Sequence, residues 1–308
     1  MTLQKTGTSS AWKKGNRNSM IIDLHIHSQS SDGAFTVEEI VKEAKRRNIE
    51  FMSITDHDSI GCQTVATDLA EKAGIRYVSG VELNVTFAHP KYHAGKPVAL
   101  DFLGYQFDAT NRALVDKLQL MAEYREERAT KILRNLNAEF EKEGIQRLTK
   151  KDFEAIEASV DGVLGRPHIA DYLVKKGIVK DRQEAFDKYL VRCNVPKYPL
   201  YLEAASKLVH NAGGKIVIAH PNDPHGTSLV ALTKSLPEQT AIIEESMLDF
   251  IDGVECWHSR NDAQTTAHYV KFAKEHSLMM TGGSDCHQKP IVMGTVAVPD
   301  YVADQFSL

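Results

Sequence analysis

The sequence predicts an α/β protein with a mainly parallel sheet and an all-helical insertion. Short apolar runs alternate with helical patterns over residues 20–107 and again over 199–308. Such alternation is typical of βαβ units, in which helices connect parallel strands. Between these two segments, over 108–198, only helical patterns occur. A third observation is that His, Asp and Glu residues repeatedly follow the apolar runs, and parallel strands end at one common edge.

The first part of the chain carries clear start and stop signals. The apolar run 20–24 is the first strand, and a capping box formed by Thr36 and Glu39 opens the helix that follows it. Gly74 closes the next helix, as a C-terminal glycine often does. The predicted strands are 20–24, 51–55, 76–81, 98–105, 215–219, 253–256 and 278–281, and the helices that accompany them are 36–47, 59–73, 201–212 and 263–276.

The middle of the chain is predicted to be an inserted helical unit. Its long first helix ends at Gly144, and its charge-rich pattern is most simply a solvated face. The helices predicted here are 111–143, 150–158, 166–176 and 182–191. We therefore expect a disordered extension over 1–19, a main α/β unit over 20–107 and 199–308, and a helical insertion domain over 108–198.

Composition excludes several classes of protein. With 308 residues, 42% apolar and 25% charged, the chain can bury a substantial core. It has no apolar run long enough for a membrane helix, and a net charge of −4 does not favour general nucleic-acid binding. Its four cysteines show no C-x-x-C spacing, and 1–19 lacks the apolar segment of a secretion signal. We expect a cytoplasmic protein that does not bind membranes.

The residues that follow the predicted strands are of metal-binding types. His25 and His27 are separated by one residue, so on an extended chain they project from the same side. The other such residues are Asp56, His57, Asp58, Glu82, His220, Asp285 and His287. In a parallel α/β fold, all of them converge on the carboxyl edge of the strands.

Each of these motifs also has a purely structural interpretation. The two histidines are equally consistent with one buried, hydrogen-bonded ring and one exposed ring. Asp56, His57 and Asp58 can form a turn or a helix cap, and Glu82 can lie at the surface. Five strand ends with the same chemistry are much harder to explain structurally, so the joint pattern favours a metal site.

Taken together, these motifs resemble the PHP (polymerase and histidinol phosphatase) family of metal-dependent phosphoesterases. The resemblance extends over residues 21–287 and is closest to the small stand-alone branch that hydrolyses nucleotide phosphates. The motifs that carry it are Asp23-Leu24-His25-Ile26-His27-Ser28, Ser31-Asp32-Gly33, Ile54-Thr55-Asp56-His57-Asp58, Gly80-Val81-Glu82, Gly165-Arg166-Pro167-His168, Ile218-Ala219-His220-Pro221 and Gly283-Ser284-Asp285-Cys286-His287. This resemblance implies a distorted (β/α)7 TIM-like barrel and a centre of two or three divalent metal ions.

The resemblance also implies a set of ligands for three metals. The first metal would be bound by His25, His27, Glu82 and Asp285. The second would share Glu82 and add His168 and His220, and the third would be bound by Asp32, His57 and His287. His168 lies in the insertion, where its other interpretation is a surface histidine at the start of a helix.

The charge of such a centre favours a phosphate substrate. Three divalent ions and three carboxylates leave about +3, because six of the nine ligands are neutral imidazoles. Mixed imidazole and carboxylate ligands suit Mn, Fe or Zn, with Mg as a further option. A metal-bound hydroxide would then attack phosphorus.

Further residues are candidates for substrate binding. Arg166 starts a predicted helix, where anions are favoured, and Lys197 lies where the chain returns to the main unit. His258 and Arg260 follow the strand 253–256, and His258 is also a candidate for protonating the leaving oxygen. Asp58 or its neighbour Asp56 would orient the ring of His57. Each of these residues is alternatively an ordinary surface or structural residue.

The preferred function is hydrolysis of phosphate from a small nucleotide of the AMP or 3',5'-bisphosphonucleotide type. One alternative is 5'-3' exonuclease action on short RNA or DNA, although the sequence lacks an aromatic and basic stacking array. Another is histidinol-phosphate phosphatase, which the helical insertion disfavours. A different class is a non-catalytic metal-binding regulatory module. The sequence does not indicate an oligomeric state.

Overall fold

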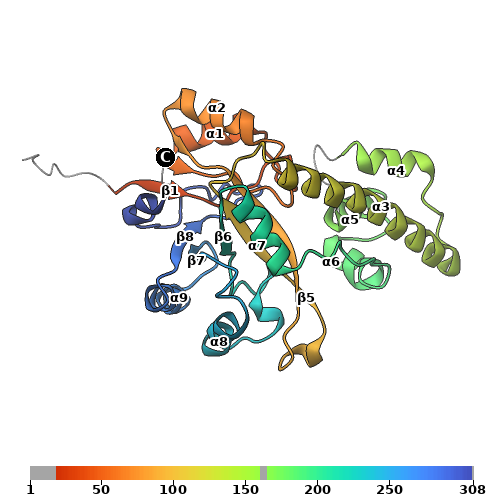
Figure 1. Cartoon of the computed structure of the whole chain (residues 1–308). Helices are drawn as coiled ribbons and strands as arrows, with labels where there is room; N and C mark the ends of the chain where they lie inside the picture. The colour runs from red at the N-terminus through yellow and green to blue at the C-terminus, as the bar shows by residue number, and fades with distance from the viewer. Residues whose placement is uncertain (1–18, 160–164, 307–308) are drawn as a thin grey trace, which may run out of the picture.

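The structure is a computed structural model, and it describes residues 19–159 and 165–306. The expected N-terminal extension therefore lies outside the described residues, apart from Ser19. Over the described part, the chain has the mixed α/β architecture that the alternation predicted, with the strands at the centre and helices around them (Figure 1).

The strands form two sheets. One is parallel, in the order β1 (Ile21–Asp23), β2 (Ile49–Met52) and β3 (Arg76–Tyr77). The other has the order β4 (Gly80–Phe87), β5 (Val98–Tyr105), β6 (Lys215–Ile218), β7 (Gly253–His258) and β8 (Met279–Gly283). The single strand expected over 76–81 is thus divided between the end of one sheet and the start of the other.

Most strand pairs are parallel, but β5 runs antiparallel to both β4 and β6. The reason is that a hairpin directly connects β4 to β5, without the crossover helix that a parallel pair requires. The two sheets approach each other where Leu24 N donates to Gly282 O at 3.1 Å and His27 N donates to Cys286 O at 3.1 Å. The pairing within two separate sheets does not establish a closed TIM-like barrel.

Helices cover the outer side of the strands. The capping box predicted at Thr36 is present, since the Thr36 hydroxyl accepts from Glu39 N and the Glu39 carboxylate accepts from Thr36 N. The helix α8 was not among the predicted elements. These helices are α1 (Val37–Arg46), α2 (Gln63–Ala73), α7 (Leu202–Asn211), α8 (Leu236–Ser246) and α9 (Ala263–Glu275), with short 3-10 turns at His93–Gly95, Leu229–Ala231 and Asp300–Gln305.

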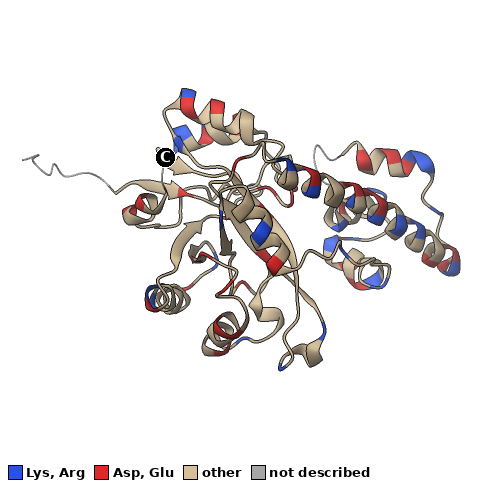
Figure 2. Ribbon diagram, viewed as in Figure 1, with Lys and Arg blue, Asp and Glu red and all other residues tan. Residues whose placement is uncertain are grey.

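The segment between β5 and α7 is helical and stands to one side of the strands (Figure 1). Its helices are α3 (Arg112–Glu143), α4 (Lys150–Glu157), α5 (Arg166–Lys175) and α6 (Arg182–Ala185), which continues into a π-helical turn over Phe186–Leu190. They enclose a core of their own that includes Leu136, Phe140, Ile169 and Leu173. The colouring of Figure 2 shows that acidic and basic residues are interspersed along α3 and α4.

Helix α3 belongs to two cores. Leu114, Leu118 and Met121 in its first half pack into the core around β4 and β5, whereas its second half packs inside the helical segment. One continuous helix therefore fixes the helical segment against the sheet. Among the described residues, none of the helices combines the length and apolarity that crossing a membrane requires.

Candidate metal centre

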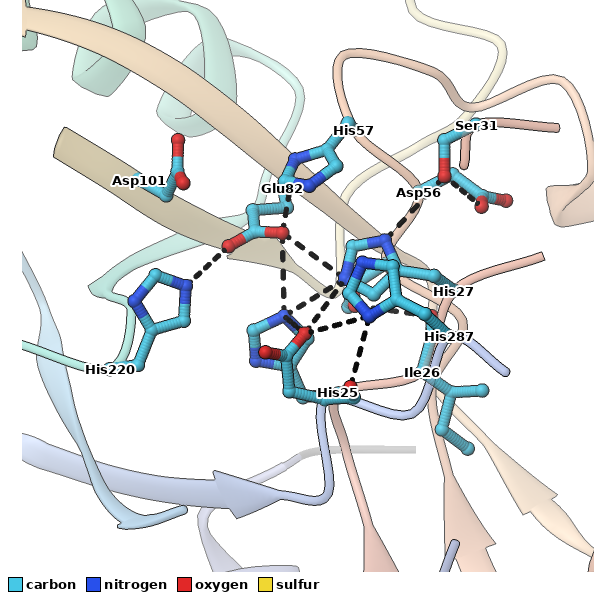
Figure 3. A network of polar contacts seen from close by, with 12 residues as sticks. His25, Ile26, His27, Ser31, Asp56, His57, Glu82, Asp101, His220 and His287 are labelled. Carbon is cyan, nitrogen blue, oxygen red and sulfur yellow. Dashed lines mark hydrogen bonds and ion pairs between the residues drawn. The ribbon is translucent and has the colours of Figure 1, made fainter. Parts of the chain in front are cut away.

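Four strands bring predicted ligand residues to one place. His25 and His27 follow β1, Glu82 lies near the start of β4, and His220 follows β6 (Figure 3). Asp285 follows β8. The approach is close, because a Cβ on Gly283 would lie 2.4 Å from His25 N. Only glycine therefore fits at this point between β1 and the loop that carries Asp285.

Four side chains converge as if on a single cation. His25 Nε2 lies 3.1 Å from His27 Nε2 and 3.4 Å from Glu82 Oε2. Asp285 Oδ1 lies 3.5 Å from His25 Nε2 and 3.4 Å from His27 Nε2, which is itself 3.2 Å from Glu82 Oε2. Ligand atoms that bind one tetrahedral cation at 2.0–2.1 Å are about 3.3–3.4 Å apart. These distances suit one tetrahedral cation pair by pair, but the sets whose ligand atoms are all close enough to share an ion are His25, His27 and Asp285, and His25, Glu82 and His220. The first set lacks the Glu82 that was expected for the first metal.

Glu82 also faces a second group. Its other oxygen, Oε1, lies 2.9 Å from His220 Nε2. Glu82 Oε2, His220 Nδ1 and His258 Nε2 are buried in this region, and none of them has a hydrogen-bond partner in the described part of the chain. Buried polar atoms are rarely left without a partner, so their arrangement here is consistent with a bound ion.

A third group contains Asp32, His57 and His287. Asp32 Oδ1 lies 3.3 Å from His287 Nε2, and Asp32 Oδ2 lies 3.8 Å from His57 Nε2. His27 joins the same group through Nδ1, at 3.7 Å from Asp32. The three residues expected for the third metal are thus close enough to share an ion.

The protonation of these groups shows how strongly they interact in the metal-free protein. Burial alone would lower the pKa of His27, but the neighbouring carboxylates of Asp285 and Glu82 outweigh burial and raise the pKa to about 10. Burial likewise opposes protonation of His220, while Glu82 raises its pKa to about 9. A divalent cation would replace the protons that these carboxylates attract.

His168 is not part of these groups. It lies at the start of α5, where its Nδ1 accepts a hydrogen bond from Gly165 N at 3.0 Å. It lines the same cavity as the metal groups, but no potential metal-binding group among the described residues includes it. Asp101 of β5, which no sequence motif marked as a ligand, is close to His57 and Glu82.

The two aspartates beside His57 have other partners. Asp56 accepts hydrogen bonds from Ser28 and Ser31, so it fixes the loop between His27 and Asp32. Asp58 accepts from Asn84 N at 2.9 Å and forms an ion pair with Arg125. The contacts of Asp58 are therefore directed at β4 and α3, and not at the ring of His57.

Glu255 of β7 is a buried carboxylate that contacts two of the candidate ligand residues on the side away from the cavity. Its Oε1 accepts from His25 Nδ1 at 3.0 Å and its Oε2 accepts from His220 N at 2.7 Å. Glu255 was not predicted as a site residue. Its position as a charged residue inside the otherwise apolar strand expected over 253–256 could have indicated a functional role.

A cavity of about 860 Å³ is lined both by residues of the metal groups and by basic side chains, most of which come from the helical segment. Three of the four predicted substrate binders, Arg166, Lys197 and Arg260, line it. The fourth, His258, is buried outside the lining, with its Nε2 3.4 Å from Asp285. Sequence reasoning missed the other cations of the lining, because arginines in a charged helix give no distinct signal. These cations are Arg125, Arg128, Arg182 and Lys289.

The basic side chains differ in how well they are neutralised. Arg125 pairs with Asp58, Arg182 with Asp171, and Arg260 with Asp223. Arg128 and Arg166 have no carboxylate partner among the described residues. Burial, together with the charges of Arg166 and Arg125, lowers the pKa of Arg128 to about 10. This part of the cavity therefore favours an anion.

Comparison with known proteins agrees with this geometry. The family model described as the PHP domain matches residues 23–206. The 3',5'-nucleoside bisphosphate phosphatase of Chromobacterium violaceum is 32% identical, over 86% of this chain and 87% of its own length. The 5'-3' exoribonuclease Rnm of Escherichia coli is 29% identical, over 87% of this chain and 86% of its own.

Solved structures show the same likeness. A candidate metal-dependent phosphoesterase from Bifidobacterium adolescentis has a TM-score of 0.75 and 26% identity, over 94% of this chain and 96% of that chain. An amidohydrolase from Chromobacterium violaceum, with sulfate and no metal bound, has a TM-score of 0.73 and 28% identity, over 92% of this chain and 93% of that chain.

Proposed function

The chain belongs to the PHP domain family and is a metal-dependent phosphoesterase, and we propose that it removes phosphate from a small nucleotide. The proposed substrates are of the AMP or 3',5'-bisphosphonucleotide type. The observation that carries this proposal is that one cavity is lined by two kinds of side chain. Metal-binding side chains come from the strand ends, and the helical segment adds two arginines that have no carboxylate partner among the described residues.

The proposed ligands are the nine residues named from the sequence. His25, His27, Glu82 and Asp285 would hold the first ion, and Asp32, His57 and His287 would hold another. His220 would bind a further ion together with Glu82, and His168 would reach it only by moving out of its contact with Gly165. Imidazole and carboxylate ligands without thiolates suit Mn, Fe or Zn.

The chain's own groups have distinct roles in this scheme. Bound divalent ions acidify a water molecule and stabilise the charge on the phosphoryl oxygens. His258, whose buried Nε2 lies 3.4 Å from Asp285, would donate a proton to the leaving oxygen, which requires the ring to become accessible from the cavity. Arg166, Lys197 and Arg260 would bind phosphate oxygens, and Asp58 would act indirectly, by holding Arg125.

The arrangement of the two sheets leads to a more specific proposal about the fold. We propose that the two sheets close into a distorted (β/α)7 barrel, with 108–198 as its helical insertion domain. Contacts join the sheets on both sides. Leu24 and His27 bond to the segment around β8, and Asp58 N donates to Glu82 O at 2.7 Å. The insertion would then supply the wall that binds substrate.

A second candidate is 5'-3' exonuclease action on short oligonucleotides. The observation that favours it is the extent of the basic lining, which runs from Arg260 beside the metal groups to Arg128 and Arg166 in the helical segment. More than one phosphate could be bound along such a wall. A relative with over 80% mutual coverage is named as an exoribonuclease.

Phosphate release from a substrate panel would separate these candidates. The protein would be loaded with Mn²⁺ or Zn²⁺ and assayed with AMP, adenosine 3',5'-bisphosphate, a 5'-phosphorylated trinucleotide and histidinol phosphate. We expect the highest kcat/KM with a mononucleotide. A higher kcat/KM with the trinucleotide would favour the exonuclease, and no release from any ester would leave only a metal-binding module.

A further inference from the structure

Glu255 is a fully buried carboxylate that the reaction scheme above does not use. It lies in β7, between the strand ends that carry His25 and His220, and it is 0% exposed. A charge in this position is costly unless it is paired and hydrogen-bonded. Its contacts therefore indicate what it does.

The contacts of Glu255 mirror those of Glu82. The His25 ring offers Nδ1 to Glu255 at 3.0 Å, and its Nε2 faces Glu82 at 3.4 Å. The backbone N of His220 donates to Glu255 at 2.7 Å, and its ring Nε2 lies 2.9 Å from Glu82. Both histidines thus lie between two carboxylates, with Glu82 on the metal side and Glu255 on the core side.

The bond to Glu255 selects the tautomer of His25. A neutral imidazole has one N–H and one lone pair. When Nδ1–H donates to Glu255, the lone pair is on Nε2, which faces His27, Glu82 and Asp285. The opposite tautomer would direct an N–H at the cation position and could not bind the metal.

The bond to His220 acts on the backbone. His220 has a φ of 25°, which is unusual for a residue other than glycine and costs conformational energy. The hydrogen bond from His220 N to Glu255 holds this conformation, and so it directs the His220 ring toward Glu82. One carboxylate therefore orients two histidines that face two different metal groups.

We propose that Glu255 is a positioning residue that fixes the His25 tautomer and the His220 backbone, and thereby sets the metal affinity of both groups. This inference rests on the proposed function only through the metal centre, and not through the identity of the substrate. Loss of such a supporting partner typically weakens metal binding 10–100-fold.

The substitution Glu255→Gln tests the requirement for a carboxylate. Both oxygens of Glu255 accept hydrogen bonds, whereas an amide accepts at one end and donates at the other. A glutamine that accepts from His220 N must direct its NH₂ group at His25 Nδ1, which favours the wrong tautomer. A glutamine in the opposite orientation loses the bond to His220 N.

Asp23 provides a matched control. It is also a buried carboxylate with both oxygens engaged, but its donors are backbone amides: Gly294 N at 2.8 Å, Ser284 N at 2.9 Å and His25 N at 3.3 Å. Asp23→Asn therefore removes a comparable carboxylate and destabilises the same region of the fold. It leaves the hydrogen bond at His25 Nδ1 intact.

The affinity of the apoprotein for Co²⁺ or Zn²⁺ would be measured by competition with a chelator, together with the visible spectrum of the Co²⁺ form. We expect E255Q to bind 10–100-fold more weakly, with an altered Co²⁺ spectrum. D23N is expected to have a lower Tm and a smaller loss of affinity than E255Q, because it disturbs the backbone amides of His25 and Ser284 but leaves His25 Nδ1 bonded to Glu255. Wild-type affinity and spectrum in E255Q would overturn the proposal.

Two further measurements cover the case in which E255Q does not fold. Glu255→Asp keeps the charge but shortens the side chain, so it should also weaken the metal and shift the spectrum. In the Zn²⁺-loaded wild-type protein, ¹⁵N NMR should show His25 protonated at Nδ1. Protonation at Nε2 would contradict the proposal, and none of these results depends on which phosphate ester is hydrolysed.

Discussion

The side chains that line the cavity from the strands and those that line it from the helical segment attract ions of opposite charge. We call them the sheet wall and the insertion wall. On the sheet side, carboxylates and imidazoles approach one another closely, as Glu82 does with His27 and His220. On the helical side, Arg128 and Arg166 lie near each other without a carboxylate. Arg128 is held by neutral groups only, since its Nε donates to Val195 O at 2.5 Å and its Nη2 to Asn194 Oδ1 at 2.7 Å.

This difference indicates that the two walls have different functions, one in binding metal and the other in binding substrate. The sheet wall is rich in lone pairs and attracts cations, whereas the insertion wall is rich in N–H donors and attracts anions. Chemistry is therefore expected to depend on the sheet wall and substrate affinity on the insertion wall. Substitutions on the two walls should affect kcat and KM differently.

The largest effect is expected on the sheet wall. His27→Ala removes a side chain that contacts both Glu82 and Asp285, so it should reduce metal content and turnover together. Because bound metals supply several kcal/mol of transition-state stabilisation, the loss in kcat should be on the order of 10³-fold or more. Metal analysis and steady-state kinetics would check this. Metal loss with turnover unchanged would contradict it.

A smaller effect is expected on the insertion wall. Arg128→Ala should raise KM for a nucleotide 3',5'-bisphosphate by about 10–100-fold, since a charged hydrogen bond contributes about 1.5–3 kcal/mol. The kcat should change little. The matched control is Arg112→Ala on the same helix, where the side chain is 92% exposed and Asp116 is its ion-pair partner. If R128A changed kcat and left KM unchanged, the insertion wall would not be the part of the cavity that sets substrate affinity.

The pH dependence of the metal-free protein sharpens the contrast further. His27 and His220 have pKa values of about 10 and about 9 when folded, against about 6.5 when unfolded. Their contribution to stability is therefore complete below pH ~6.5 and is lost as the pH rises through 9–10. The Tm of EDTA-treated protein should fall over that range. A constant or rising Tm would show that these protonated pairs do not stabilise the fold.

The smallest effect on turnover is expected from the core of the insertion. Leu136 is fully buried in that core, and Leu136→Ala should cost about 2–5 kcal/mol of stability. At temperatures where the variant is folded, its metal content and kcat should equal those of the wild type. Differential scanning calorimetry and metal analysis would test this, and a loss of metal in L136A would show that the two walls are not independent.

Most residues of the sheet wall could be picked out from the sequence, whereas of the arginines and lysines on the insertion wall only Arg166 and Lys197 could. His25, His27, Glu82 and Asp285 could be identified because each follows or begins an apolar strand, and strand ends are positions that a pattern reveals. Arg125 and Arg128 could not be identified, because a charged helix looks the same whether it faces solvent or a cavity. His168 lies in the cavity lining apart from the metal groups, and its placement depends on how the insertion packs, which no local pattern encodes.

The fold was predictable to a similar degree. Alternating apolar runs and helices predicted the α/β class, but not the direction of β5, since a strand looks alike in either direction. Glu255 was overlooked because burial and hydrogen bonding, which give it its importance, are properties of the folded chain. In each case the missing information concerns long-range contacts.

Helix α3 packs into the cores on both sides of the cavity and so links the two walls. It has 32 residues, so it is about 48 Å long, and its two halves are anchored in different cores. The arginines that face the cavity sit near its middle, where the two anchored halves meet. On such a helix, moving an arginine by one turn displaces it by about 5.4 Å without disturbing the strands. The position of an arginine along α3 therefore determines how far its charge lies from the metal groups.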